Sequence, residues 1–156
     1  METYNNVCED GNSLYLGKYH KVRQIKTLKE FIAGSHKLYK ENTAFLTKDK
    51  KGGDYREITY DSFKGDVDAL GTKLIDMGLK GRKIAVIGEN CYDWVTAYFA
   101  VTAGTGVIVP LDKELSKEEI KRLIDTAECS AVFYTNTYSK IFENIDIEFK
   151  FEMSVY

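Results

Sequence analysis

The sequence has little of the residue types that mark metal-bound or disulfide-stabilised folds. Its 156 residues include one proline, three cysteines and two histidines. Cys8, Cys91 and Cys129 are odd in number and form no C-x-x-C pair, which excludes a disulfide scaffold and a cysteine zinc site. His20 and His36 have no Cys or His neighbour at ligand spacing, so we expect no metal site. This cysteine usage fits a reducing compartment and predicts a cytoplasmic protein.

An excess of one charge is also absent. The chain carries 22 basic and 24 acidic residues, a net charge of −2, which removes the electrostatic reason to expect nucleic acid or an anionic membrane as a partner. The longest apolar stretch, residues 94–109, is interrupted by threonines and glycines and is too short to span a bilayer. Residues 1–10 lack the basic-then-apolar pattern of a signal peptide. We therefore expect no transmembrane segment.

The chain has instead the composition of one globular domain. Hydrophobic residues make up 44% and charged residues 29%, and the length fits a single domain. Residues 1–26 show no clear period, and we expect them to wrap the surface of a domain formed by residues 27–156.

The N-terminal half of that domain predicts two helices and a hairpin. An apolar period starts a helix at Thr27, and short strands at 44–47 and 55–59 flank a turn that contains Gly52 and Gly53. The basic stretch 48–51 beside that turn is interpreted as a solvated surface, with phosphate binding as the alternative. Thr59 then caps a helix that Gly78 ends. One face of this helix is apolar: Tyr60, Phe63, Val67, Leu70, Leu74 and Met77.

The C-terminal half alternates strands and helices. Strands are predicted at 83–87, 107–109 and 131–135, with helices at 93–103 and after the capping box that starts at Ser116. A short helix at 138–145 and an alternating strand over 147–155 follow. The fold class is therefore α/β, with a mostly parallel sheet of strand-helix-strand-helix-strand order, right-handed crossovers, flanking helices and a β-hairpin near the N-terminus.

The helix at 93–103 is apolar on nearly all sides, which predicts burial on several sides. Asn90 and Asp93 have the spacing of a capping box at its start. Trp94 is expected in the core, because valine, tyrosine and phenylalanine side chains surround it along the helix. Cys91 lies near the helix N-terminus, where a thiol pKa can be lowered, but the apolar surroundings without a cation favour an inert thiol.

Motifs that carry chemistry are missing. Gly88 follows a strand, but no second glycine completes a dinucleotide fingerprint, and Gly104-Thr105-Gly106 precedes a strand and not a helix. No Gly-x-Ser-x-Gly or His-Glu-x-x-His run occurs. Helix dipole and solvation explain the carboxylates of Glu118, Glu119 and Asp125 better than acid–base catalysis does. We therefore assign no catalytic, cofactor-binding or metal-binding residue.

Two long runs nevertheless resemble one superfamily. The runs ITYDSFKGDVDALGTKLIDMGLKGRKIAVIGEN and GENCYDWVTAYFAVTAGTGVIVPLDKELSKEEIKRLIDTAECSAVFYT are similar to the opening subdomain of the adenylate-forming (AMP-binding) ligases. The earlier run TLKEFIAGSHKLYKENTAFLTKD resembles the helix and first strand of such enzymes. Asp93-Trp94 and Val109-Pro110-Leu111 resemble the long-chain acyl-CoA synthetases most.

The resemblance implies a parent enzyme that joins a fatty acid to coenzyme A through an acyl-adenylate, using ATP and magnesium and releasing AMP and pyrophosphate. The family's phosphate loop ends in Gly-x-Pro-Lys, and no such run occurs here. The resemblance thus predicts a truncated N-terminal subdomain, structural and inactive by itself, whose partner is the remainder of the ligase chain. A stand-alone interaction or regulatory module is the alternative. A small Rossmann-like nucleotide binder is the weakest hypothesis, since no phosphate-cradling loop is present.

The C-terminal end predicts self-association. Alternating apolar residues (Ile147, Phe149, Phe151, Met153 and Val155) place five side chains on one face of a strand close to Tyr156. Such a strand would offer an open edge for a homodimer. In the alternative, three charged residues between them (Glu148, Lys150 and Glu152) keep the edge solvated and the tail frays.

Overall fold

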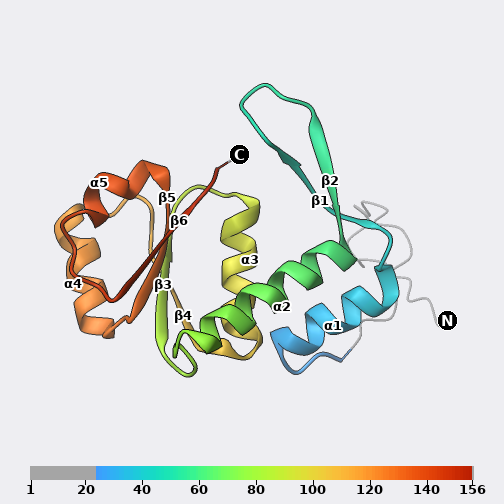
Figure 1. Ribbon diagram of the computed structural model, residues 1–156, viewed down its shortest axis with the longest axis horizontal. Coiled ribbons are helices and arrows are strands. Elements are labelled where there is room, and N and C mark those ends of the chain that lie inside the picture. Colours follow the sequence, from blue (N-terminus) through green and yellow to red (C-terminus); the bar gives the residue numbers. More distant parts are fainter. Residues whose placement is uncertain (1–23, 156) are drawn as a thin grey trace, which may run out of the picture.

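A computed structural model describes residues 24–155 of the chain. Cys8, His20 and most of the expected surface-wrapping segment lie outside the described residues. In the described part, a parallel sheet carries helices on both faces, and a hairpin and an N-terminal helix lie to one side (Figure 1). No helix of this part is long and apolar enough to cross a membrane.

The main sheet has four parallel strands in the order β4-β3-β5-β6. The strands are β3 (Lys83–Ile87), β4 (Val107–Pro110), β5 (Ala131–Thr135) and β6 (Phe149–Met153). This confirms the predicted α/β class and the strand-helix-strand-helix-strand order. β3 and β5 lie in the centre, and their side chains are almost entirely buried because both sheet faces are covered.

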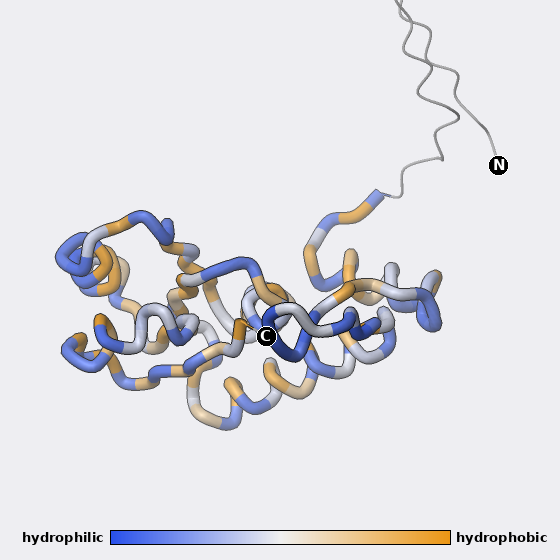
Figure 2. The backbone as a smooth tube through the Cα atoms, turned by 90° about the horizontal axis from the view of Figure 1, so that it is seen from above, coloured by the Kyte–Doolittle hydropathy of each residue, from blue (hydrophilic) through white to orange (hydrophobic). Residues whose placement is uncertain are grey.

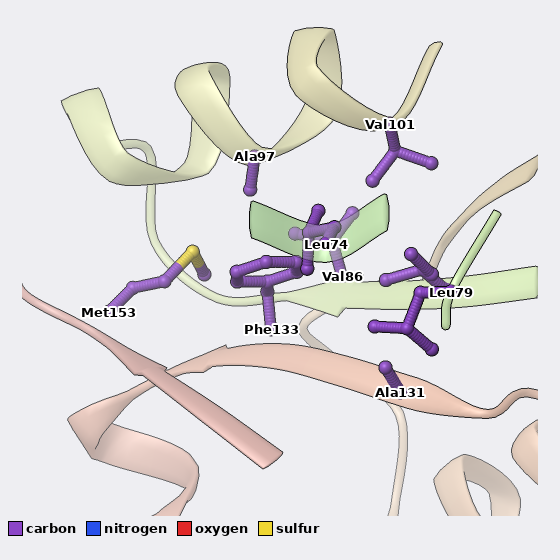
Figure 3. Packing of buried hydrophobic residues seen from close by; sticks show 9 residues of the cluster. Leu74, Leu79, Val86, Ala97, Val101, Ala131, Phe133 and Met153 are labelled. Atoms are coloured by element: carbon purple, nitrogen blue, oxygen red, sulfur yellow. The ribbon is translucent and has the colours of Figure 1, made fainter. Parts of the chain in front are cut away.

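The two faces of the sheet bury different side chains of the same strands. On one face, α2 (Tyr60–Asp76) and α3 (Tyr92–Ala100) pack over alternate residues of the strands, as Figure 3 shows for Leu74, Ala97 and Val101 above Val86 and Phe133. On the other face, α4 (Lys117–Ala127) and α5 (Ser139–Phe142) cover the intervening residues, which include Ala85, Ile87 and Val132.

Three predicted helix starts are confirmed in atomic detail. The hydroxyl oxygen of Thr27 accepts from the backbone N–H of Glu30 at 3.1 Å, and that of Thr59 accepts from Ser62 at 3.1 Å. At the start of α4, Ser116 and Glu119 satisfy each other's backbone N–H groups in a complete capping box. Each cap supplies an acceptor to a backbone donor that the helix itself leaves unpaired.

The predicted cap of α3, formed by Asn90 and Asp93, is wrong. Cys91, with extended φ and ψ, is the residue that precedes the helix, and its side chain makes no capping hydrogen bond. The carboxylate of Asp93 accepts instead from the backbone N–H of Ser154 at 3.0 Å. Asp93 therefore ties the helix start to the segment after β6, a tertiary contact that local spacing cannot show.

Burial of α3 is also less complete than its composition predicts. Only Thr96, Ala97 and Ala100 are fully buried within the helix. Trp94 is half-buried and stacks on Tyr98, with ring centroids 5.5 Å apart and planes 11° apart. The expectation of a core tryptophan thus holds only in part, because the ring packs on the cluster edge rather than inside it.

The helical path continues past α3 as a π-helical turn over Val101–Thr105, in which Gly104 has φ +139°. The regular α-helix thus ends at Ala100, about one turn before the predicted end at residue 103. Gly106 then approaches Arg82 so closely that a Cβ would lie 2.3 Å from its carbonyl oxygen, so the turn into β4 requires glycine.

The N-terminal part forms a separate small layer. α1 spans Leu28–Tyr39, and β1 (Thr43–Lys48) and β2 (Tyr55–Thr59) pair antiparallel, which confirms the predicted hairpin. In its turn, the backbone N–H of Gly53 donates to Lys50 at 3.0 Å. Figure 2 shows apolar and polar stretches alternating along this layer as they do along the rest of the chain.

The predicted C-terminal strand is shorter than its alternation indicates. β6 covers Phe149–Met153, and Phe149, Phe151 and Met153 pack on the same face as α3. Ile147 packs with the cluster on the opposite face, so the prediction of five side chains on one face is wrong for this residue. The chain turns before the strand begins, which changes the side to which Ile147 points.

Candidate functional site

The carboxyl ends of β3 and β5 form the first place to look for a ligand site. From central β3 the chain runs to β4 on one side and then crosses to β5 on the other side. In open α/β sheets, ligands commonly bind in the crevice that such a change of direction leaves at the carboxyl ends of the strands.

At this crevice the ends of β3 and β5 approach each other closely. Gly88, directly after β3, has φ +146°, and a Cβ on it would lie 2.5 Å from side-chain atoms of Thr135 at the end of β5. Thr135 is fully buried, and its hydroxyl donates to a carboxylate oxygen of Glu89. The side chain of Thr135 therefore occupies the space between the strand ends that a phosphate would need.

The charge at the strand ends also opposes a phosphate. The Thr135 hydroxyl, together with the backbone N–H of Glu89, holds the pKa of the Glu89 carboxyl below its ordinary value, so the group is ionised at neutral pH. Nearby, the Tyr138 hydroxyl donates to the Lys113 carbonyl at 2.8 Å, and burial raises the pKa of this phenol. The close approach of Thr135 to Gly88 and the anionic Glu89 therefore disfavour a phosphate directly between these two strand ends.

The residues that sequence reasoning examined for chemistry lie far apart. Cys91 lies before α3, and burial raises the pKa of its thiol, which agrees with the inert interpretation. Glu119 belongs to the capping box, Asp125 pairs with Lys121, and His36 contacts Asp61 at 2.7 Å. Within residues 24–155, no three His, Cys, Asp or Glu side chains lie close enough to hold a metal ion.

The basic stretch at residues 48–51 lies at the tip of the hairpin. Lys48 places its ammonium group 4.4 Å from the centre of the Tyr55 ring, in a cation–π contact. Lys50 closes the turn through its carbonyl oxygen. These contacts agree with the solvated-turn interpretation.

Sequence reasoning missed two polar pairs. Glu89 follows β3 and Thr135 ends the neighbouring strand β5. Because the carboxyl ends of parallel strands meet at one edge of a sheet, the sequence could have predicted this pair. Asp66 of α2 accepts from the hydroxyl of Tyr92 at 2.6 Å, a contact between helices that no local pattern indicates.

Among residues 24–155, three of the open cavities lie on the α2 side of the molecule. One of about 420 Å³ lies between α1, α2 and the π-helical turn, and one of about 350 Å³ lies between the hairpin and the start of α3. The third, of about 400 Å³, lies between α2, α3 and β6.

The arrangement as a whole defines a class: an open parallel α/β subdomain with helices on both faces, in which Thr135 fills the gap between the ends of the central strands. The family model of the AMP-binding enzymes matches residues 35–152. The chain belongs to the AMP-binding enzyme family, which confirms the resemblance noted in its sequence.

Curated relatives include CoA ligases of plants and archaea. Long chain acyl-CoA synthetase 1 of Arabidopsis thaliana is 31% identical over 93 residues, which are 59% of this chain and 14% of the relative. The 4-hydroxybutyrate–CoA ligase 2 of Metallosphaera sedula is 25% identical over 109 residues, 69% of this chain and 19% of the relative. The chain thus spans less than a fifth of the length of either protein.

Solved structures share the fold at low identity. An anthranilate CoA ligase in complex with anthranoyl-AMP matches with a TM-score of 0.72 and 15% identity over 85% of this chain and 26% of the ligase. A long-chain-fatty-acid-CoA ligase from Archaeoglobus fulgidus matches with a TM-score of 0.69 and 16% identity over 82% of this chain and 27% of the ligase. The fold is therefore that of a ligase N-terminal subdomain.

Proposed function

We propose that this chain supplies the N-terminal subdomain of an ATP-dependent, AMP-forming acyl-CoA synthetase. The observation that carries the proposal is the AMP-binding family match over residues 35–152, in a chain that spans only 26% to 27% of two solved CoA ligases with the same fold. The parent reaction converts a carboxylic acid, ATP and CoA into acyl-CoA, AMP and pyrophosphate. A long-chain fatty acid is the proposed substrate, supported by the named activity of the plant relative.

The proposed role of this subdomain is architectural. Its central strands are buried on both faces. At the carboxyl ends of these strands, Thr135 fills the gap and Glu89 carries a negative charge. Because Thr135 and Glu89 disfavour a phosphate between the central strand ends, we assign the binding of ATP, magnesium and CoA to the remainder of a ligase chain, which is the proposed partner. The proposed location of that enzyme is the cytoplasm, supported by the cysteine usage, which fits a reducing compartment.

The first test is whether the chain alone forms acyl-adenylates. Formation of an adenylate requires donors placed around the phosphates, and the printed sequence has no run that ends in Gly-x-Pro-Lys. We expect no ATP–pyrophosphate exchange above the protein-free blank with ATP, magnesium and a long-chain fatty acid. Exchange by the purified chain would show that it carries a nucleotide site and would refute the architectural role.

The second test is the gene itself. If the proposal is correct, the reading frame continues past the Tyr156 codon into a Ser/Thr/Gly-rich run that ends in Gly-x-Pro-Lys. A stop codon directly after Tyr156 would refute the parent enzyme and favour the stand-alone interaction or regulatory module.

We also propose that the isolated chain can form a homodimer through β6. This strand pairs with β5 on one side and lies at the edge of the described sheet. The Phe149 N–H donates towards β5, so the N–H of Lys150 points to the open side, where proline would block pairing with a second copy. Light scattering should show a dimer for the parent chain and for Lys150→Ala, and a monomer for Lys150→Pro. A monomeric parent chain would contradict the proposal.

A further inference from the structure

The cavity between α2, α3 and β6 has an apolar floor. Leu70, Phe133 and Met153 line it, and the latter two are almost fully buried. Figure 3 shows the Met153 side chain beside the Phe133 ring beneath α3. With a volume of about 400 Å³, the cavity has room for the apolar stem of a small ligand or a long side chain.

Two carboxylates lie at the wall of this cavity. Asp66 accepts the hydroxyl hydrogen of Tyr92 at 2.6 Å, and Asp93 accepts the backbone N–H of Ser154 at 3.0 Å. Neither carboxylate forms an ion pair with any residue between 24 and 155. An ionised carboxylate can accept about four hydrogen bonds, so both groups keep free acceptor capacity.

A third polar group in the cavity wall lacks a partner. Thr96 is 7% exposed, and its hydroxyl oxygen has no hydrogen-bond partner among the described residues. The Tyr92 hydroxyl lies one helical turn away and donates its own hydrogen to Asp66 at 2.6 Å. Burial and Asp66 raise the pKa of that phenol and Thr96 lowers it, through a contact that lies outside hydrogen-bond geometry. A buried hydroxyl left unpaired costs free energy, so its position on a cavity wall indicates a ligand that bonds to it.

The nearby charges favour a cation. The start of α3 contributes a positive partial charge of about half a unit, less than the two negative charges of the carboxylates. Arg56, the cation whose charge reaches Tyr92, bonds to Asp49 at 3.2 Å. Glu152 also lines the cavity, but its carboxylate accepts from Ser139 of α5 at 2.7 Å and therefore lies on the other side of the sheet.

We propose that this cavity binds a guanidinium or primary ammonium group on an apolar stem. The carboxylates of Asp66 and Asp93 take up the charged N–H donors, the Thr96 hydroxyl accepts one further N–H, and the apolar floor packs against the stem. Such a group can belong to an arginine or lysine of a polypeptide that lies along β6, or to a free alkylamine. The inference does not depend on the proposed ligase role.

Amide NMR titration of the whole chain distinguishes these cases. The probes are butylguanidine, the neutral isostere butylurea, and the capped pentapeptides Ala-Val-Arg-Val-Ala and Ala-Val-Gln-Val-Ala. Butylguanidine should shift the amides of Thr96, Asp93 and Met153, and butylurea should bind about tenfold or more weakly, since it lacks the charge. A tighter arginine peptide assigns the site to a polypeptide, and a weaker one assigns it to a free amine.

Matched variants locate the effect. Asp66→Asn and Asp93→Asn should each weaken butylguanidine binding about three- to tenfold. Asp125→Asn removes the same charge on the opposite face and should bind like the parent chain. Thr96→Val, which replaces the unpaired hydroxyl with a methyl group, should weaken binding about threefold.

Three results would overturn the proposal: no shifts from butylguanidine or the arginine peptide up to about 10 mM, equal binding of butylurea, or equal weakening by Asp125→Asn. Amide dispersion in each spectrum reports whether a variant is folded. If one aspartate variant unfolds, the other and Thr96→Val still decide the outcome.

Discussion

The sheet and the N-terminal layer bury their apolar residues to very different extents. Ile84, Val86 and Val132 in the central strands are 0% exposed, whereas Leu46 and Tyr55 in the hairpin are 59% and 66% exposed. A parallel sheet needs helices on both faces, and this one has them. A two-stranded hairpin is marginally stable alone and depends on what packs against it.

The inner side of the hairpin packs against the helices through Phe45 and the buried Ile58. Phe45 of β1 packs edge-on against Phe63 of α2 and against Tyr92 of α3, with centroids 4.9 and 5.6 Å away. Outward-facing residues such as Leu46 lack comparable cover among the described residues. The stability of the molecule should therefore reside in the sheet, and the predictions that follow test this contrast.

The largest effect is expected for Phe142→Ala. Phe142 of α5 is 0% exposed and stacks on Tyr134 at 4.6 Å. Truncation leaves a cavity in the core and should lower the free energy of unfolding by about 3–5 kcal/mol. Urea denaturation followed by circular dichroism measures it, with Tyr55→Ala in the hairpin as the control. Equal losses from the two variants would contradict the contrast between sheet and hairpin.

Trp94→Ala should have an intermediate effect. The ring is half-buried on the edge of the sheet cluster and stacks on Tyr98, so its truncation should cost about 2 kcal/mol, roughly half the cost of a fully buried aromatic residue. The same urea titration tests this value. A loss as large as that of Phe142→Ala would restore the original expectation of a core tryptophan, and an unchanged midpoint would place the ring in solvent.

The hydrogen bond between Thr135 and Glu89 at the strand ends should make the free energy of unfolding depend on pH. Thr135→Val removes the hydroxyl that donates to Glu89 and should cost about 0.5–1 kcal/mol at pH 7, because the carboxylate is partly solvated. The folded-state pKa of Glu89 lies below its ordinary value, so its contribution is present above the unfolded pKa and is lost as the pH falls through the folded pKa. The difference between parent and variant should therefore shrink below about pH 4.

Stability measured from pH 7 to pH 3 tests this, with Glu89→Gln as a second variant. In the Glu89→Gln background, Thr135→Val should show no such pH dependence. A difference that stays constant with pH in the parent background would mean that Thr135 acts through packing against Gly88 alone.

Local signals predicted the regular elements well. Thr59 and Ser116 were read correctly as caps, because a cap depends on residues within three positions of it. The cap of α3 was read incorrectly, because Asp93 bonds to Ser154, 61 residues away. Ile147 was placed on the wrong face for a related reason: alternation is informative only where the strand has already begun.

The candidate site divides in the same way. The missing glycine fingerprint predicted no dinucleotide loop at the end of β3, and the structure adds that Thr135 lies directly against Gly88 there. The cavity with Asp66, Asp93 and Thr96 has no counterpart in any sequence motif, since it forms where α2, α3 and β6 meet. Sites of this kind depend on the packing of distant elements and cannot be inferred from spacing.

The smallest effect is expected for Leu46→Lys, and it sharpens the comparison most. Leu46 and Phe45 are neighbours in β1 and point to opposite sides of the hairpin. Phe45→Ala should cost about 2 kcal/mol through lost contacts with Phe63 and Tyr92, whereas Leu46→Lys should change the free energy of unfolding by no more than about 0.5 kcal/mol. Urea titration of both variants measures the difference.

If Leu46→Lys is as costly as Phe45→Ala, the outer side of the hairpin is covered in solution. The surface-wrapping segment predicted at residues 1–26 is then the first candidate, and a chain that starts at residue 24 should lose the cost of Leu46→Lys while keeping that of Phe45→Ala.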